Sequence, residues 1–248
     1  MTDEERLLRH FHDLAGKAYA QDRPIFTGFL NEAEQSLLLT HADEFSYCGF
    51  ALFGGTQGCQ RQMACFAPAE DTVYPIACIK IEPKQQKFAD QLTHRDFLGA
   101  VMHLGLEREC VGDILVKDNL GMLFCTQPMA AYIAENIDSV RHTAVRCTVM
   151  DKPPEEMLFK LEEQLVQAAS ERADAVIARL FRLSREEANA LFFAKKIAVN
   201  ARITENNSYQ LKPGDVVSVR GHGKFIFDGV VSLSKKGKSN CRIRLYTQ

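Results

Sequence analysis

The chain has 248 residues, of which 46% are apolar and 25% charged, and its formal net charge at pH 7 is −2. These fractions are typical of a globular protein and exclude collagen-like, fibrous and largely disordered chains. The longest runs without a charged residue, 45–60 and 119–134, have 16 residues each, and a membrane span needs about 18–20 apolar residues. The beginning MTDEERLLRHF is charged and has no apolar segment, so no secretory signal is predicted. We therefore expect a cytoplasmic protein without a membrane partner.

Eight cysteines are spread over the chain without any CxxC pair, and the closest two are six residues apart. Most lie within apolar segments such as YCGFALF and IACIKIE, as small buried side chains do in a reducing compartment. The short ligand spacings of zinc sites are missing. The sequence therefore predicts neither a metal site nor a cofactor.

The first 74 residues are predicted to form a small α+β domain. Its expected elements are helices over residues 4–20 and 32–41 and strands over residues 47–53 and 61–67. Asn31 followed by Glu34 is a capping box that opens the second helix. The pair Gly54-Gly55 lets the chain turn after the first strand, so that the second strand can return as its hairpin partner.

A second domain with the order βαββαβ is predicted over residues 75–150. Its expected elements are strands over residues 76–82, 111–116, 121–126 and 143–150 and helices over residues 88–104 and 128–137. This is the ferredoxin-like or RNA-recognition-like (RRM-like) plan, which by itself implies no function. Only Phe124 is aromatic in the third strand, and residues 76–150 hold 8 basic against 9 acidic side chains. We therefore expect a protein-binding or ribosome-docking surface here, without base stacking.

The end of the chain is predicted to be a third domain, residues 172–248, in which a helix pair lies on a small, strongly curved sheet. An acidic amphipathic stretch precedes it and predicts a linker helix within residues 151–171. Ser184 and Glu187 form a capping box at the start of the second helix. The expected elements are helices over residues 172–181 and 184–193 and strands over residues 197–200, 216–220, 224–233 and 242–246. The fold class of the chain is thus α+β.

Charge is distributed unevenly along the sequence. Residues 1–171 contain 15 Lys and Arg against 26 Asp and Glu, whereas residues 172–248 contain 15 against 6. Solubility needs no such segregation, so the basic end is interpreted as a polyanion-binding and, in the cytoplasm, nucleic-acid-binding domain. One alternative is a solvated basic face that meets the chain's own acidic part. An anionic membrane surface is disfavoured because the basic residues are not gathered on one amphipathic helix.

The second helix of the basic domain is suited to phosphate. The N–H groups at its start carry a partial positive charge, and Arg185 adds a two-pronged donor there. Lys195 and Lys196 follow just after the end of the same helix. For each residue taken singly a solvated surface charge is the alternative, but the cluster predicts a phosphate-binding surface.

The string RADAVIARLFRLSREEANALFFAKKIAVNARI, followed by LKPGDVVSVRG and SKKGK, resembles the S-four RNA-binding domain, also called the alpha-L motif. In that family the second helix and the sheet edge beside it line the RNA. The resemblance implies RNA contacts at Arg172, Ser184, Arg185, Lys196, Asn200, Arg202, Arg220 and Lys224, and nearby basic residues extend the expected set to Arg182, Lys195, Lys235, Lys236 and Lys238. Lys195 stands where the family usually has Gly, which costs roughly 1 kcal/mol if the position needs a positive φ. Lys224 stands where the family has an Arg, so one guanidinium fork is lost.

Other motifs resemble those of YlmH-type bacterial proteins. They are Phe53-Gly54-Gly55, the block LTHRDFLGA over residues 92–100, and Arg108 followed by Gly112-Asp113-Ile114, with a departure at Gln60, where the family usually has Glu. The resemblance implies association with the large ribosomal subunit and a role in rescuing subunits that carry an obstructed nascent chain on tRNA. It also implies a link to cell division. The expected partner is structured ribosomal or transfer RNA, bound by a monomer.

The triplet His94-Arg95-Asp96 is similar to part of a kinase catalytic loop, but Val101 stands where that loop needs Asn, and no Gly-rich phosphate loop precedes it. Thr93 is instead expected to cap a helix whose start Asp96 favours. His94 and Arg95 are then either structural pairs or ribosome contacts.

Catalytic motifs are missing from the sequence: there is no GxGxxG, GxSxG, HExxH, Walker lysine or GRxD segment of a pseudouridine synthase. We therefore predict a non-catalytic RNA-binding protein of the translation apparatus, without catalytic residues. Two alternatives stay open, an RNA-modifying enzyme with an S-four targeting domain and a protein-binding adaptor in cell division.

Overall fold

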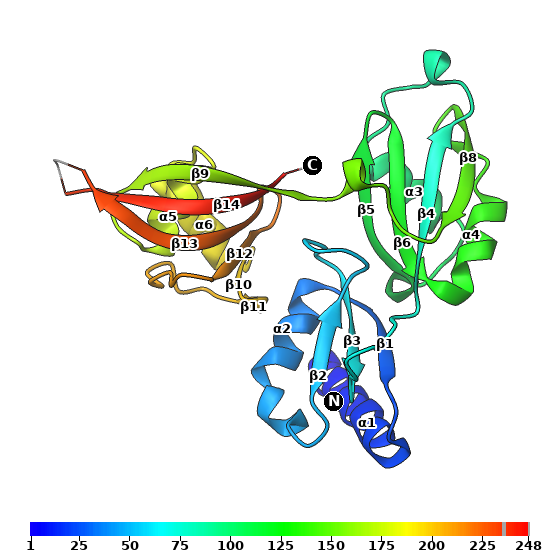
Figure 1. The fold of residues 1–248 in the computed structure, drawn as a ribbon, viewed down its shortest axis with the longest axis horizontal. Helices are drawn as coiled ribbons and strands as arrows, with labels where there is room; N and C mark the ends of the chain where they lie inside the picture. Colours follow the sequence, from blue (N-terminus) through cyan, green and yellow to red (C-terminus); the bar gives the residue numbers. More distant parts are fainter. Residues whose placement is uncertain (235–236, 248) are drawn as a thin grey trace. The chain divides into compact units, whose positions relative to one another are not determined.

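The computed structural model describes residues 1–234 and 237–247, so two of the predicted RNA contacts, Lys235 and Lys236, lie outside the described residues. The chain divides into two compact units, one made of residues 1–34 and 41–158 and the other of residues 35–40 and 159–247 (Figure 1). In the described part of the chain, no helix is both long and apolar enough to cross a membrane.

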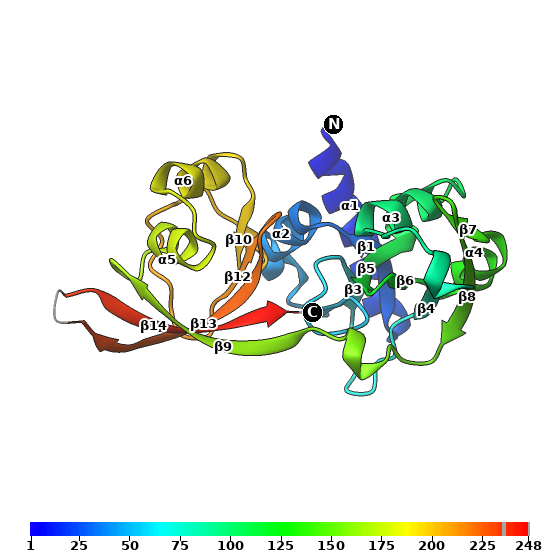
Figure 2. The same cartoon turned by 90° about the horizontal axis from the view of Figure 1, so that it is seen from above.

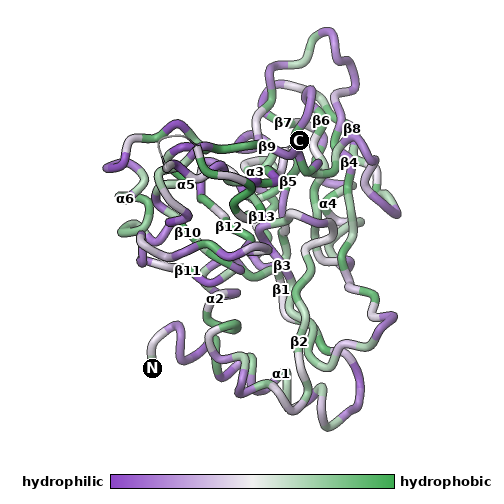
Figure 3. The backbone as a smooth tube through the Cα atoms, turned by 60° about the vertical axis from the view of Figure 1, so that its left-hand side comes forward, coloured by the Kyte–Doolittle hydropathy of each residue, from purple (hydrophilic) through white to green (hydrophobic). Residues whose placement is uncertain are grey.

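The first unit begins with a helix and a three-stranded antiparallel sheet in the order β1-β3-β2, and a second helix starts in this unit and continues into residues 35–40, which belong to the second unit. The elements are α1 (Asp3–Gln21), β1 (Ile25–Leu30), α2 (Glu32–Thr40), β2 (Phe50–Phe53) and β3 (Gln62–Phe66), with the short 3-10 helix η1 (Ala42–Phe45). Both predicted helices are confirmed. Asn31 accepts hydrogen bonds from the N–H groups of Ala33 and Glu34 and donates its own to the Glu34 carboxylate, which completes the capping box. β2 and β3, the two strands that the sequence predicts here, are largely hydrophobic (Figure 3). The third strand, β1, was not predicted.

The second part of this unit has the predicted βαββαβ order. Its elements are β4 (Ile76–Pro83), α3 (His94–Met102), β5 (Val111–Lys117), β6 (Leu120–Thr126), α4 (Ala130–Asn136), β7 (Ser139–Val140) and β8 (Thr143–Met150), with the 3-10 helices η2 (Gln86–Phe88), η3 (Arg108–Cys110) and η4 (Gln127–Met129). The antiparallel sheet order β5-β6-β4-β8-β7 confirms the ferredoxin-like plan. Phe97 and Ile133 from the two helices pack with Ile79, Ile81 and Leu123 from the central strands in one core.

α3 is shorter than the helix predicted over residues 88–104. It starts only after Thr93, whose N–H and hydroxyl both donate to Asp96 Oδ2 at 2.8 and 2.7 Å. The predicted cap is confirmed, and these hydrogen bonds lower the pKa of Asp96. Residues 84–92 therefore form a loop between β4 and the capped helix.

The predicted linker helix within residues 151–171 is wrong. The chain forms a short 3-10 turn, η5 (Glu155–Met157), and then β9 (Lys160–Ala168), which pairs along its whole length with β14. Val166 and Ala168 are buried while Leu165 and Gln167 between them are exposed, which is a strand alternation. The same residues fit a helical pattern over a short stretch, and only pairing with a distant strand decides between them.

The second unit is a helix pair on a six-stranded antiparallel sheet. Its remaining elements are α5 (Ala173–Leu180), α6 (Arg185–Phe193), β10 (Ile197–Val199), β11 (Arg202–Ile203), β12 (Val216–Val219), β13 (Gly223–Leu233) and β14 (Ser239–Thr247), in the sheet order β11-β10-β12-β13-β14-β9. Both helices lie on the same face of the sheet (Figure 2). Ile177 and Phe192 pack there on Val217, Phe225 and Ile243, all of which are fully buried.

Candidate nucleic-acid interface

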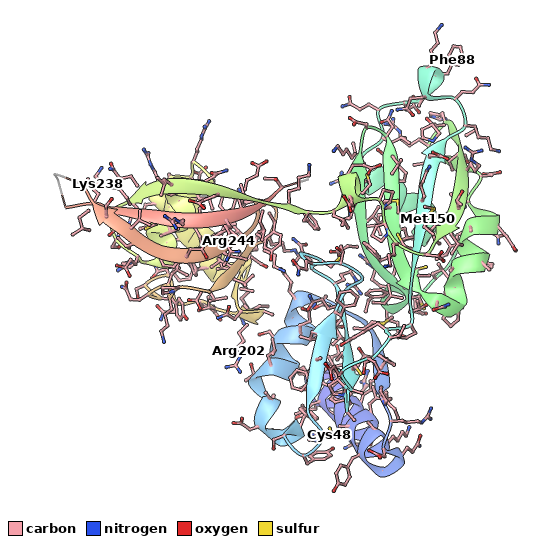
Figure 4. All side chains as sticks on the ribbon, viewed as in Figure 1. Cys48, Phe88, Met150, Arg202, Lys238 and Arg244 are labelled. Carbon is pink, nitrogen blue, oxygen red and sulfur yellow. The ribbon has the colours of Figure 1, made fainter. Side chains whose placement is uncertain are left out.

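The corner between α5 and α6 contains a hollow with a volume of about 600 Å³. Its walls come from the end of β9, from α5, from the α5–α6 connection and from the tip of the β13–β14 hairpin, where Lys238 lies (Figure 4). The cationic side chains that line it are Arg172, Arg179, Arg182, Arg185 and Lys238. Two separate parts of the sequence, residues 172–185 and Lys238, thus place five basic groups around one concave surface.

Arg172 differs from the other cations of the hollow because it is already paired. Its Nε and Nη2 donate to the two carboxylate oxygens of Asp174 at 3.0 and 2.8 Å, and the Asp174 side chain is only 3% exposed. This interaction raises the pKa of Arg172. A fork held by a buried carboxylate is fixed in place and largely neutralised, so the free positive charge of the hollow comes from its other basic residues.

Arg179 is a member of this set that the sequence analysis missed. It lies on α5, seven residues after Arg172 and three before Arg182, and it lines the hollow. That spacing places the three side chains on one side of the helix and its exit. The signal was present in the sequence as the string RADAVIARLFR, in which basic residues recur at helical intervals.

The connection between the two helices is built around Arg182, whose φ of 56° lies in the left-handed region. Leu183 N–H then bonds back to the carbonyl of Ala178 and ends α5. A non-glycine residue costs free energy in this conformation. The turn is nevertheless made by an arginine that faces the hollow, as is typical where a strained residue has a functional side chain.

Ser184 caps α6 as predicted. Its hydroxyl accepts from Glu187 N–H at 3.1 Å, and the Glu187 carboxylate accepts from Ser184 N–H at 2.7 Å, which lowers the pKa of Glu187. These bonds occupy two of the N–H groups at the start of the helix, and Glu186 adds a second negative charge in the first turn. The helix terminus by itself is therefore a weaker anion site than expected, and the arginines must supply the attraction.

Lys195 and Lys196 lie at the other end of α6. Lys195 N–H bonds to Phe192 O and Lys196 N–H to Leu191 O, the paired bonds of a Schellman ending. Lys195 has a φ of 54°, so the position where the S-four family usually has Gly is left-handed here too. Its ammonium lies 3.4 Å from the Glu205 carboxylate. Both lysines are exposed, one helix length away from Arg185.

The other predicted contacts are not gathered at the hollow. The Asn200 amide donates to Asp215 at 2.8 Å and accepts from Val216 N–H at 2.9 Å, so both of its ends hold a turn. Arg202 on β11 donates to Leu39 O at 2.7 Å within the same unit. Arg220 is exposed after β12. Lys224 lies over the Tyr246 ring, 5.5 Å from its centre.

Basic residues on the opposite face of this sheet are paired with acids. Arg244 donates to both carboxylate oxygens of Asp228 at 2.7 and 2.9 Å, which raises the pKa of Arg244. Arg242 lies 3.2 Å from the Glu163 carboxylate of β9. The charge of these two arginines is therefore largely neutralised, unlike that of Arg179, Arg182 and Arg185 at the hollow.

Several motif residues of the first unit form an internal network. The Arg61 guanidinium donates to the carbonyls of Phe29, Arg108 and Val111 at 2.6, 3.0 and 2.9 Å, and Asp113 accepts from Arg61 N–H at 3.1 Å. Burial lowers the pKa of Arg61. These bonds join β1 and β3 to the beginning of β5, so the role of these residues is to hold the two halves of the unit together.

The glycine motif of this unit serves close packing. Gly55 has a φ of 102°, and a Cβ atom there would lie 2.5 Å from the Phe124 ring; one on Gly112 would lie 2.7 Å from the Phe29 ring. Phe124 is only 1% exposed. On the sheet face that an RNA-recognition fold uses for base stacking, the one aromatic side chain of β6 is thus covered by the unit's own residues.

His94 and Arg95 are exposed at the start of α3. Arg95 lines a hollow of about 410 Å³ together with His103 and Arg141, and Asp96 and Asp138 lie in the same wall. The mixed charges of this hollow give it no clear preference for an anion. Whether the two residues contact a partner stays a prediction.

All eight cysteines are free, and Cys59, Cys65, Cys78, Cys125 and Cys241 are buried. Burial raises the pKa of Cys78 and Cys125 to about 12. These thiols are therefore protonated at physiological pH and are not nucleophiles. Among the described residues, no three His, Cys, Asp or Glu side chains come together as a metal site.

The fold and the hollow together define a class, an α+β protein in which a ferredoxin-like unit precedes a basic helix pair on a curved sheet. Comparison with known proteins shows which families the chain is similar to. Residues 68–153 match the family model described as "Putative RNA-binding domain in YlmH". The chain is 27% identical over 226 residues to "Ribosome-associated protein quality control protein P2" of Bacillus subtilis, with 88% of this chain and 86% of that protein covered. Over most of its length the chain is thus similar to YlmH-type RNA-binding proteins.

A shorter similarity concerns the C-terminal unit. The small ribosomal subunit protein uS4 of Chromohalobacter salexigens is 49% identical over 63 residues, which cover 25% of this chain and 31% of that protein. The same protein from Hahella chejuensis is 44% identical over 63 residues. Among solved structures, "Cell division protein ylmH from Streptococcus pneumoniae" has a TM-score of 0.46 and 21% identity, with 60% of this chain and 93% of that chain covered. The C-terminal unit is therefore similar to the S-four domain, as the sequence motifs indicated.

Proposed function

We propose that this protein is a non-catalytic RNA-binding factor of the translation apparatus. It binds structured ribosomal or transfer RNA on the large ribosomal subunit and acts in the rescue of stalled subunits. The observation that carries the proposal is the hollow of the second unit, where Arg179, Arg182, Arg185 and Lys238 surround one concave surface while Arg172 is held by Asp174.

Guanidinium groups fit this task because each presents a planar fork of donors to phosphate oxygens. A concave surface of this size accommodates a stretch of sugar-phosphate backbone, and contacts of this kind recognise the shape of a folded RNA. The segregation of charge along the chain also favours a polyanion at this end, because residues 1–171 carry 11 more acidic than basic side chains.

The relatives supply the cellular context. The name of the Bacillus subtilis relative refers to ribosome-associated quality control, and the family model that matches the first unit refers to RNA binding. The large subunit, transfer RNA and the rescue of obstructed nascent chains follow from the YlmH-type resemblance. None of the names refers to catalysis, which is consistent with a binding protein.

The test is co-sedimentation with large ribosomal subunits after charge reversal in the hollow. The variant Arg179→Glu/Arg182→Glu/Arg185→Glu should lose at least about tenfold in affinity, because three phosphate contacts are replaced by repulsion. A charge-matched control reverses three exposed cations of α1, with the substitutions Arg6→Glu, Arg9→Glu and Lys17→Glu, and should sediment like the wild type. Equal loss in both variants would mean that net charge, and not the hollow, governs binding.

Salt dependence gives an independent measurement. With about 4 phosphate contacts, affinity should fall by about a hundredfold between 50 and 200 mM salt, because that many counterions are displaced from the RNA. A fall in affinity of less than about threefold over the same salt range would contradict binding through phosphate contacts.

A further inference from the structure

The loop between β4 and α3 projects the most exposed aromatic side chain of the described residues. Phe88 is 77% exposed and lies at the outer end of this loop, in the 3-10 turn η2 (Figure 4). The remaining side chains of residues 84–91 are polar or charged, apart from Ala89. Single exposed apolar side chains are common on protein surfaces, so Phe88 is a candidate contact only if the loop holds it in place and other binding groups lie beside it.

The loop is anchored at several points, so the exposure of Phe88 is built into the fold. Gln86 donates to Asp118 O at 2.9 Å, Asp90 N–H donates to the Thr143 hydroxyl at 2.9 Å, and Leu92 N–H donates to the Asn119 side chain at 2.8 Å. The Leu92 side chain is 4% exposed and belongs to the core of the ferredoxin-like sheet. The same loop thus buries its leucine and presents its phenylalanine.

Positive charge accompanies the ring. Lys87 Nζ lies 5.9 Å from the centre of the Phe88 ring, and Lys84 lies at the base of the same loop. Protein interfaces usually surround an aromatic anchor with other apolar side chains, and this ring has none beside it in the loop except Ala89. A single aromatic ring with a cation beside it and a second one in the same loop fits an unpaired nucleobase with its flanking phosphates better.

The sheet of this unit leaves RNA no alternative aromatic platform among the described residues. Phe124 is 1% exposed, and Met122 and Cys78 on the same face are 0% and 4% exposed. If residues 68–153 take part in binding RNA, the contact must come from a loop or an edge. Phe88 at 77% exposure is the most accessible aromatic side chain for it, ahead of Tyr132 at 44%.

We propose that Phe88 stacks on an unpaired nucleobase of the bound RNA while Lys84 and Lys87 contact the neighbouring phosphates. This inference rests on the proposed function, since it needs an RNA partner, and it adds a second contact that is separate from the arginine hollow. It also specifies the chemistry: a single-stranded or bulged base is recognised, because a base within a duplex is already stacked on both faces.

The absence of tryptophan from the chain makes the contact directly measurable. Phe88→Trp introduces the only indole, whose emission is quenched when a base stacks on it. The probe is a single-stranded adenylate 12-mer, compared with a fully paired duplex of the same length. The control is Tyr132→Trp, because Tyr132 is a 44% exposed aromatic on α4 of the same sheet unit.

The expected result is that the single strand quenches the indole of Phe88→Trp, whereas the duplex changes it little and the indole of Tyr132→Trp responds to neither. If Phe88→Trp shows no quenching up to about 1 mM of single strand, well above ordinary non-specific dissociation constants, the proposal is overturned. Equal quenching by the duplex would overturn it as well, since stacking on an unpaired base would then not be the cause.

Co-sedimentation with large ribosomal subunits separates this inference from the proposed function. Phe88→Ala and Phe88→Leu should each weaken binding about tenfold, whereas Phe88→Tyr should keep it, because only an aromatic ring stacks on a base. If Phe88→Leu binds as well as the wild type, an apolar protein pocket receives the side chain and the inference fails. Unchanged binding by Phe88→Ala leaves the proposed function standing and removes only the inference. If the wild type does not sediment with subunits, the proposed function fails, and the fluorescence titration still decides on Phe88.

Discussion

Replacing Lys195 by glycine should stabilise α6 while removing a basic side chain. Lys195 has a φ of 54° at the Schellman ending of the helix. Glycine adopts this left-handed conformation without a steric clash, so the substitution removes about 1–2 kcal/mol of conformational strain. The extra freedom of glycine in the unfolded chain offsets about 0.5–1 kcal/mol of this. The ion pair with Glu205 adds almost nothing to the loss, because the two side chains are 65% and 57% exposed. The net effect of Lys195→Gly is a stabilisation of about 0.5 kcal/mol.

The neighbouring position is the matched control. Lys196 is exposed and follows in the same ending, but its φ is not positive, so Lys196→Gly loses the same charge without any relief and should destabilise by about 1 kcal/mol. Hydrogen exchange of the amides of α6 reports local stability without assuming that the two units unfold together. The exchange rates of the two variants should differ by about tenfold. Equal rates, or slower exchange in Lys196→Gly, would refute the assignment of strain to Lys195.

Three further predictions concern stability and reactivity. Arg61→Met should destabilise the first unit by about 3 kcal/mol, measured by urea unfolding, because three carbonyl groups lose their donor. The hydrogen bonds to Ser184 lower the pKa of Glu187. The stabilisation of α6 by the Glu187 carboxylate is therefore complete above the ordinary carboxyl pKa and is lost as the pH falls through the lowered pKa. Hydrogen exchange of the α6 amides, measured across this acid range, should show the loss of stability. Cys78 and Cys125, with pKa values raised to about 12 by burial, should resist iodoacetamide at pH 8 in the native protein and react in urea, as read by mass spectrometry.

Each of these has an outcome that contradicts it. Wild-type stability in Arg61→Met would show that the network does not join the two halves of the unit. Glu187→Gln should abolish the pH effect on α6, and an unchanged effect in this variant would assign it to another carboxylate. Burial predicts that the half-buried Cys110 reacts faster than the buried Cys78 in the native protein. Rapid alkylation of Cys78 together with slow alkylation of Cys110 would contradict this prediction.

Local signals predicted much of the fold. The capping boxes at Asn31, Thr93 and Ser184 are all present where the sequence places them, and in each the bonded groups lie three residues apart or less. Such features need no distant partner, so the order of residues is enough to specify them. The family pattern left open whether Lys195 needs a positive φ, and the structure decides this, since its φ is 54°.

The errors occurred where a distant segment decides. β9 has the composition of an acidic amphipathic helix, and it became a strand because residues 239–247, far along the chain, pair with it. β1 was missed for a similar reason, since its six residues pair with β3 rather than with a neighbour in sequence. The register of a strand is set by its partner, which a single sequence does not display.

The candidate site shows the same division. The net positive charge of the last 77 residues, the helix pair and most members of the basic cluster follow from the order of residues alone, because composition and periodicity are local properties. Tertiary structure alone decided that Arg172 is neutralised by Asp174, that Asn200 holds a turn, and that the Phe124 side chain is buried. The physical reason is that a side chain's charge and burial in the folded state depend on which groups surround it, and those groups come from parts of the chain that only folding brings together.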